Sequence, residues 1–183
     1  MRERAKINRT RTLVLCAVFA AVSAAASPWV IPVGPVPVGL THISVFLSAA
    51  VLGAKRAAAS QAVFVALGAA GVPVFSGFEG GLGKIAGPTG GFIAGYVFAA
   101  FVAGLVIERF GRSYPALFLG MYAGWAATYA VGLPWFMLVT GSGIVQAFVL
   151  CVLPFLVPDA VKTVICAALA RRIDAARLEG ENL

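Results

Sequence analysis

The segment PFLVPDAVK (residues 154–162) opens the last long apolar run of the chain, which continues to Ala170 and stops at a pair of arginines. Pro158 suits the first position of a helix, where its missing N–H is not needed. Asp159 then lies in the first turn, where the helix dipole favours an anion. Lys162 follows three residues later, so both ionisable side chains share one face of the predicted helix.

The two charges lie far from the ends of this run. If Arg171 marks one membrane surface, a rise of about 1.5 Å per residue puts Lys162 roughly 13–14 Å inside it. The hydrocarbon core is about 30 Å thick, so Lys162 is expected near mid-membrane, with Asp159 one turn further out. Ionisable side chains at that depth are costly and by default face an aqueous cavity or a ligand. A pair that only stabilises a helix start is the alternative.

The composition indicates an integral membrane protein. Of the 183 residues, 61% are hydrophobic and 11% are charged, whereas a soluble domain carries about 25% charged residues. The apolar runs are continuous instead of alternating, which argues against a β-barrel. The 21 glycines fit close helix packing. We therefore predict an all-α membrane protein that forms a single membrane domain over residues 1–183.

Six apolar segments predict six transmembrane helices. Both termini then lie on one side, together with twelve of the fourteen Lys and Arg residues, all but Lys84 and Lys162. By the positive-inside rule this side is cytoplasmic. The basic start also resembles a cleaved signal peptide, but the six-helix count favours a retained first helix. The expected elements are a cytoplasmic tail at 1–11, a bundle at 12–171 with helices at 12–27, 42–53, 57–71, 90–107, 115–133 and 158–170, and a cytoplasmic tail at 172–183.

Three segments between the helices lack the pattern of a regular helix. They span residues 28–41, 72–89 and 134–157, and the first contains four prolines, which a helix interior does not accept. Two of the helices are too short to cross about 30 Å of hydrocarbon alone. Irregular backbone at membrane depth must be covered by protein or line a cavity. We expect an outward-facing ligand pocket roofed by these loops.

The sequence GPTGG (residues 87–91) is the most specific-looking loop. Thr89 is expected to cap the following helix through its hydroxyl, and Gly90 and Gly91 to leave N–H groups free for an anion or a carbonyl oxygen. Close packing of the loop on the bundle is the alternative. His42, the only histidine, is either structural or part of a site below the roofing loop.

Several chemistries are excluded. GGLGKI (residues 80–85) fails as a phosphate loop, since Ile85 stands where Ser or Thr is required. No His/Cys cluster or carboxylate pair offers metal or hydrolytic chemistry, and an enzyme that uses Asp159 as acid–base would lack a nucleophile. The basic residues form no patch with interleaved aromatic residues, so nucleic acid is not expected. We predict a protein that is not an enzyme and has no cofactor or metal.

Small residues recur on the first helix. Ala17, Ala21 and Ala25 are four residues apart, and such a row lets another helix approach closely. Packing within the chain and docking of a partner membrane protein both remain open.

Four elements together resemble one family. They are Val36-Pro37-Val38; GVPVF (71–75) with GGLG (80–83); GPTGG (87–91); and Pro154-Phe155-Leu156 followed by Asp159-x-x-Lys162. In order and spacing they resemble, from about residue 12 to 171, the BioY family, the biotin-binding S-components of energy-coupling factor transporters.

The resemblance implies a six-helix protein of a prokaryotic plasma membrane that binds biotin on the outer side. It implies a transmembrane coupling protein and two cytosolic ATP-binding-cassette ATPases as partners. Asp159 and Lys162 would belong to the biotin site, and Ala17, Ala21 and Ala25 would form the docking surface for the coupling protein. A high-affinity biotin-capture subunit is the leading hypothesis. A stand-alone biotin facilitator and an S-component for another vitamin are the alternatives.

Biotin offers two ureido N–H donors, a ureido oxygen and a tail carboxylate. Asp159 can accept the N–H groups, while Lys162 or Lys84 can donate to either oxygen group. Trp125 and Tyr129 are expected beside the apolar thioether ring. The candidate ligand-binding residues are Asp159, Lys162, Lys84, Gly87, Thr89, Gly90, Val38, His42, Trp125 and Tyr129.

Overall fold

The computed structural model describes residues 2–32 and 35–181, and side-chain surroundings for 10–32 and 35–174. It consists mainly of helices, with one two-stranded sheet. The elements are α1 (Arg2–Ala26), β1 (Val30–Ile31), β2 (Val38–Gly39), α2 (Thr41–Leu52), α3 (Ala54–Ala69), α4 (Leu82–Ala86), α5 (Gly90–Phe110), α6 (Tyr114–Thr140), α7 (Ile144–Cys151), a 3₁₀ turn (Leu153–Phe155) and α8 (Leu156–Glu181).

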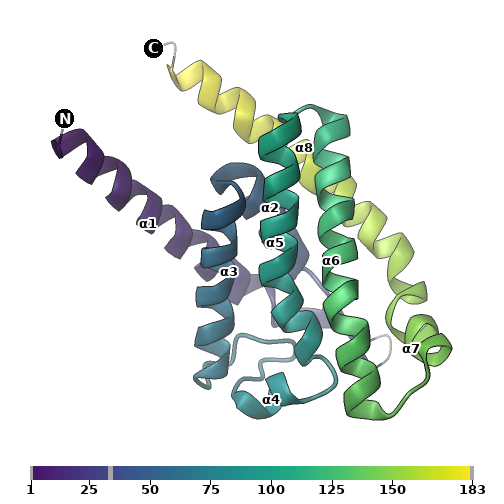
Figure 1. The fold of residues 1–183 in the computed structure, drawn as a ribbon. Coiled ribbons are helices and arrows are strands. Elements are labelled where there is room, and N and C mark those ends of the chain that lie inside the picture. Colours follow the sequence, from purple (N-terminus) through teal and green to yellow (C-terminus); the bar gives the residue numbers. More distant parts are fainter. Residues whose placement is uncertain (1, 33–34, 182–183) are drawn as a thin grey trace.

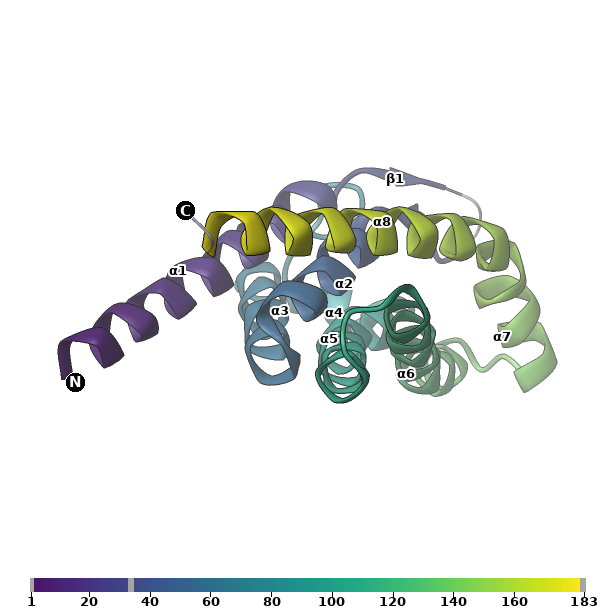
Figure 2. The same ribbon diagram turned by 90° about the horizontal axis from the view of Figure 1, so that it is seen from above.

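Helices α3, α5 and α6 run side by side, and α5 packs most extensively on α6 (Figure 1). Seen from above, α8 lies along one side of this row, with α2 between α8 and the row (Figure 2). Both termini lie at the same end as the α2–α3 and α5–α6 turns, and α4 and α7 lie at the other end. The main core fills the space between α2, α5, α6 and α8 and includes Phe46, Ala99, Met121 and Cys166.

The chain is an integral membrane protein by the length and apolarity of its helices. Within the described residues, three helical segments are long and apolar enough to cross a membrane: Gly90–Phe110, Tyr114–Thr140 and Ile144–Asp174. Two shorter apolar helices, Thr10–Ala26 and Thr41–Leu52, accompany them. Large apolar side chains such as Phe101 and Leu105 point outward, as expected of surfaces that contact lipid tails.

Several helices are longer than the sequence predicts. α1 begins at Arg2 instead of residue 12, and α8 continues past Ala170 to Glu181, because Ala, Arg, Lys, Leu and Glu are good helix formers. α6 continues past residue 133 through Pro134 to Thr140, since membrane helices tolerate proline where neighbours satisfy the freed backbone groups. Pro158 is the third residue of α8, not the first, and still lies in the turn whose N–H groups lack intrahelical partners.

The three segments expected to be irregular contain short elements. Residues 28–41 include an antiparallel β1–β2 pairing, with Val30 opposite Gly39. Residues 72–89 include α4 and a bridge between Phe75 and Glu79. Residues 134–157 contain the end of α6, all of α7 and the 3₁₀ turn. These short elements pair backbone N–H and C=O groups that would otherwise be buried without hydrogen-bond partners.

Buried polar side chains tie the first three helices together. The Ser23 hydroxyl on α1 lies 2.8 Å from that of Ser44 on α2, and it donates to Gln61 Oε1 on α3 at 3.1 Å. The Gln61 amide in turn donates to Ser48 Oγ. Hydrogen bonds of this kind stabilise helix association in membranes, where apolar contacts with lipid compete with apolar contacts between helices.

We expect Gly104→Ala to destabilise the protein by about 1–3 kcal/mol through overpacking. A Cβ at this position would lie 2.5 Å from the Cα of Ala54 and 2.6 Å from its backbone nitrogen, which cannot move aside as a side chain can. Thermal unfolding in detergent measures the effect. The matched control is Gly83→Ala in α4, where a Cβ meets nothing within 4 Å. Equal melting temperatures for the two variants would contradict this packing.

Candidate functional site

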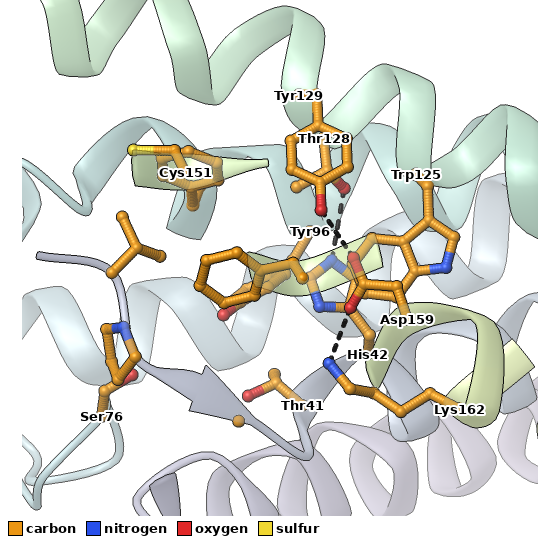
Figure 3. Close-up of a pocket in the computed structure, with 15 residues that line it drawn as sticks. Thr41, His42, Ser76, Tyr96, Trp125, Thr128, Tyr129, Cys151, Asp159 and Lys162 are labelled. Atoms are coloured by element: carbon orange, nitrogen blue, oxygen red, sulfur yellow. Dashed lines mark hydrogen bonds and ion pairs between the residues drawn. The ribbon is translucent and has the colours of Figure 1, made fainter. Parts of the chain in front are cut away.

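The hollow of interest lies between α2, α5, α6, α8 and the β1–β2 hairpin (Figure 3). Its polar wall consists mainly of Asp159 and Lys162, from the first turns of α8. Thr41 and His42 contribute from the start of α2, and Trp125 contributes from the middle of α6. The site is therefore formed mainly by α2, α6 and α8, which also pack against one another in the main core.

Asp159 and Lys162 form a buried ion pair. Lys162 Nζ lies 2.9 Å from Asp159 Oδ1, and the two side chains are 8% and 7% exposed. The Tyr129 hydroxyl donates to the other carboxylate oxygen, Oδ2, at 2.5 Å. The carboxylate thus has a partner at each oxygen, which offsets the cost of a charge held away from water.

An aromatic stack supports the cation. Lys162 Nζ lies 5.1 Å from the ring centroid of Trp125, a distance at which the ring face attracts a positive charge. The His42 ring stacks on the Trp125 ring, and the two ring centroids are 3.9 Å apart. The Trp125 indole N–H donates to Thr163 Oγ1 at 3.1 Å, which fixes the plane of the indole.

His42 is held from several directions. Its Nε2 lies 3.3 Å from Thr128 Oγ1, and the Tyr96 ring meets it edge-on at 5.0 Å. His42 is 9% exposed. The side chain therefore has a fixed orientation at the boundary of the hollow, and a role in ligand binding stays a prediction.

Five of the ten predicted ligand-binding residues line the hollow: His42, Trp125, Tyr129, Asp159 and Lys162. The other five do not. Val38 packs against a second apolar cluster around Phe136. Lys84 forms an ion pair with Glu79 at 2.9 Å on the surface, instead of turning inward.

The GPTGG loop packs against α6. The Gly87 carbonyl accepts a hydrogen bond from the Trp135 indole N–H at 2.9 Å. Thr89 precedes α5 but makes no capping bond through its hydroxyl. The Gly90 N–H donates to the Gly87 carbonyl, and a Cβ on Gly91 would lie 2.3 Å from that of Trp135. These contacts agree with the alternative of close packing, and binding of a ligand by this loop stays a prediction.

Sequence reasoning missed several lining residues. The chief ones are Thr41, Tyr96, Thr128 and Phe155. Tyr96 could be found only from its partners in space, since nothing in its apolar surroundings on α5 marks it. Thr128 precedes Tyr129, and its hydroxyl bonds back to the Gly124 carbonyl at 3.2 Å, an ordinary role for threonine in a membrane helix.

The hollow is narrow in this structure. Its cavity volume is about 40 Å³, whereas small-molecule pockets span about 300–1,000 Å³. Ser76 closes one side, and the adjacent Gly77 N–H donates to the Pro28 carbonyl at 3.0 Å. Trp29 meets Phe78 edge-on at 5.5 Å. The two loops thus hold each other over the site.

The three alanines predicted to dock the coupling protein face away from the bundle. Ala17, Ala21 and Ala25 are exposed along one face of α1, whereas Ala20 and Ser23 point inward and are buried. Within the described residues, no element of the chain covers this row of alanines.

The fold and the hollow define a class, that of helical membrane proteins with a polar hollow near one end of the bundle. A solved structure of the S-component for biotin from an ECF-type ABC transporter has the same fold. Its TM-score is 0.84 at 24% identity, over 92% of this chain and 93% of that one.

The chain belongs to the BioY family, whose sequence profile matches residues 1–179. The probable biotin transporter BioY of Pyrococcus horikoshii is 38% identical, over 90% of this chain and 97% of its own length. The biotin transporter BioY of Thermotoga maritima is 37% identical, over 92% of this chain and 99% of its own length.

We expect Lys162→Met to lower the free energy of unfolding by about 3–5 kcal/mol, because Asp159 is left as an unpaired buried charge. The double variant Asp159→Asn/Lys162→Met should recover most of this loss, and unfolding of the purified single variants, Asp159→Asn included, and of the double variant in detergent completes the cycle. Lys84→Met is the control, since that lysine pairs with a half-exposed glutamate and such pairs contribute about 0–1 kcal/mol. Additive effects at positions 159 and 162 would contradict a coupled pair.

Proposed function

We propose that this protein is the high-affinity biotin-binding subunit of a vitamin uptake transporter, and not an enzyme. Separate ATPases would supply the energy through a transmembrane coupling protein. The observation that carries the proposal is the buried Asp159–Lys162 pair at the wall of an enclosed hollow. The biotin transporters of the same family, similar over most of their length, support biotin as the ligand.

The polar groups of the hollow suit the two ends of biotin. A carboxylate can accept up to four hydrogen bonds, and Asp159 uses two of them in this structure, so ureido N–H groups can still bind there. The Lys162 ammonium has three donors and spends one on Asp159, which leaves two for the ureido oxygen or the tail carboxylate. Trp125 and Tyr129 present ring surface for the thioether ring.

The ligand must displace the roof before it can bind. The free space in the hollow is smaller than a vitamin requires. The two roof loops are joined to each other by a backbone hydrogen bond from Gly77 to Pro28 and by the Trp29–Phe78 contact, and these contacts would have to part. Biotin would enter from the end that carries α4 and α7 (Figure 1), and the roof would close over it.

The proposed orientation has six spans with the tails at 1–11 and 172–183 in the cytoplasm of a prokaryotic cell. The basic turns between α2 and α3 and between α5 and α6 lie at the end of the bundle that carries both termini, which agrees with the positive-inside rule. The pocket then faces outward. In this orientation the alanine row of α1 faces the surrounding membrane, and the coupling protein would dock on it there.

We expect Asp159→Ala to weaken biotin binding by several kcal/mol, about 100-fold or more in Kd, because ligand N–H groups and Lys162 lose their partner. Equilibrium binding to the purified protein in nanodiscs measures the loss. Asp174→Ala is the control: it lies on the same helix and removes an ion pair with Arg112 far from the hollow. Unchanged affinity of a folded Asp159→Ala protein would remove this residue from the site.

We expect Ala21→Trp to abolish biotin uptake into vesicles that contain the coupling protein and ATPases, while the Kd for biotin stays unchanged. A large side chain on the alanine row prevents close approach of a partner helix. Ala66→Trp, at an exposed position of α3, is the control. Uptake by the isolated chain at the rate of the full assembly would favour the stand-alone facilitator instead.

A further inference from the structure

A second recess lies at the opposite end of the bundle from the hollow. It is a groove between α1, the α2–α3 turn and α8, and a water-sized sphere can be centred in about 410 Å³ of it. Leu15, Val51, Leu52 and Ile173 form its apolar surface. Arg11 from α1 and Arg56 from α3 line it as well, together with Thr12. We call this recess the arginine groove.

The two arginines of the groove have no acidic partner among the residues whose side chains the structure describes. Two other basic residues at this end are engaged: Arg112 pairs with Asp174 at 2.5 Å, and Arg171 stacks over Tyr114 at 5.6 Å. The nearby Glu108 carboxylate accepts the Ala54 backbone N–H at 3.0 Å, at the start of α3, instead of pairing with Arg56. Within the described side chains, the groove therefore presents two guanidinium groups that form no ion pair.

The position of the groove favours a lipid over a soluble anion. It lies beside apolar helices and at the end of the bundle where basic residues gather, so it faces the headgroup region of one leaflet. Guanidinium groups bind phosphate oxygens through paired N–H donors, and basic pockets between membrane helices on this side bind anionic headgroups. The four apolar residues below them offer a surface for an acyl chain.

We propose that the arginine groove binds one anionic phospholipid, with its phosphodiester between Arg11 and Arg56 and an acyl chain along Leu15, Leu52 and Ile173. The site is separate from the alanine row. Successive residues lie about 100° apart around a helix, so Arg11, Thr12 and Leu15 share one face of α1, and Ala17 and Ala21 lie on another. Bound lipid would thus lie beside the docking surface without covering it.

Native mass spectrometry of the protein released from nanodiscs tests the proposal. The discs contain equal amounts of phosphatidylglycerol and phosphatidylcholine with identical acyl chains. We expect the wild type to retain one phosphatidylglycerol in preference to phosphatidylcholine. The variant Arg11→Gln/Arg56→Gln should lose this preference by about 10- to 30-fold, from about 1 kcal/mol per arginine near an anionic surface.

Two matched variants separate a specific site from net charge. Arg109→Gln/Arg172→Gln removes the same charge from exposed positions at the same end and should retain the lipid. Arg11→Lys/Arg56→Lys keeps the charge and should retain most of the preference. Thermal unfolding and gel filtration of each variant establish that it is folded.

Three outcomes would overturn the proposal. One is equal retention of the two lipids by the wild type. Another is the same loss in both glutamine double variants, which would indicate general attraction to a negative surface. The third is a groove that serves a protein instead: Arg11→Gln/Arg56→Gln would then weaken assembly with the coupling protein and leave lipid retention unchanged. Displacement of the lipid by glycerol phosphate at equal concentration would show that the headgroup alone is recognised, and would remove the acyl chain from the site.

Discussion

The contact on which the site depends is the ion pair between Asp159 and Lys162 inside a bundle built for lipid surroundings. A charge far from water is tolerated only when it is paired and hydrogen-bonded. Three helices meet this requirement together: α8 supplies both charges, α6 supplies the Tyr129 hydroxyl and the Trp125 ring, and α2 supplies His42, which stacks on that ring. The polar site and the packing of these helices therefore depend on each other.

The bundle and the roof are built in different ways. Between helices, small residues let backbones approach so closely that a single methyl group would clash, as at Gly104 against Ala54. The roof consists of short elements from two distant loops, joined by the Gly77–Pro28 hydrogen bond and the contact between Trp29 and Phe78. The dense bundle holds the ion pair in place, while opening of the roof would require the two loops to part from each other.

The two ends of the molecule carry different arrangements of charged side chains. At one end, a closed hollow presents an acid, a base and aromatic surface, and its charges compensate each other when no ligand is bound. At the other end, the arginine groove presents two arginines that form no ion pair within the described side chains, beside an apolar surface. The first arrangement leaves acceptors on Asp159 and donors on Lys162 for the polar groups of a ligand. The second suits an anion.

The sequence by itself determined the membrane class, the approximate position of each apolar helix and the common face of Asp159 and Lys162, because these follow from local composition and from the periodicity of a helix. The sequence did not determine that Lys84 pairs with Glu79, or that the GPTGG loop packs on Trp135. Those outcomes depend on contacts between segments far apart in the chain, and only the tertiary structure decides which side chains those segments bring together.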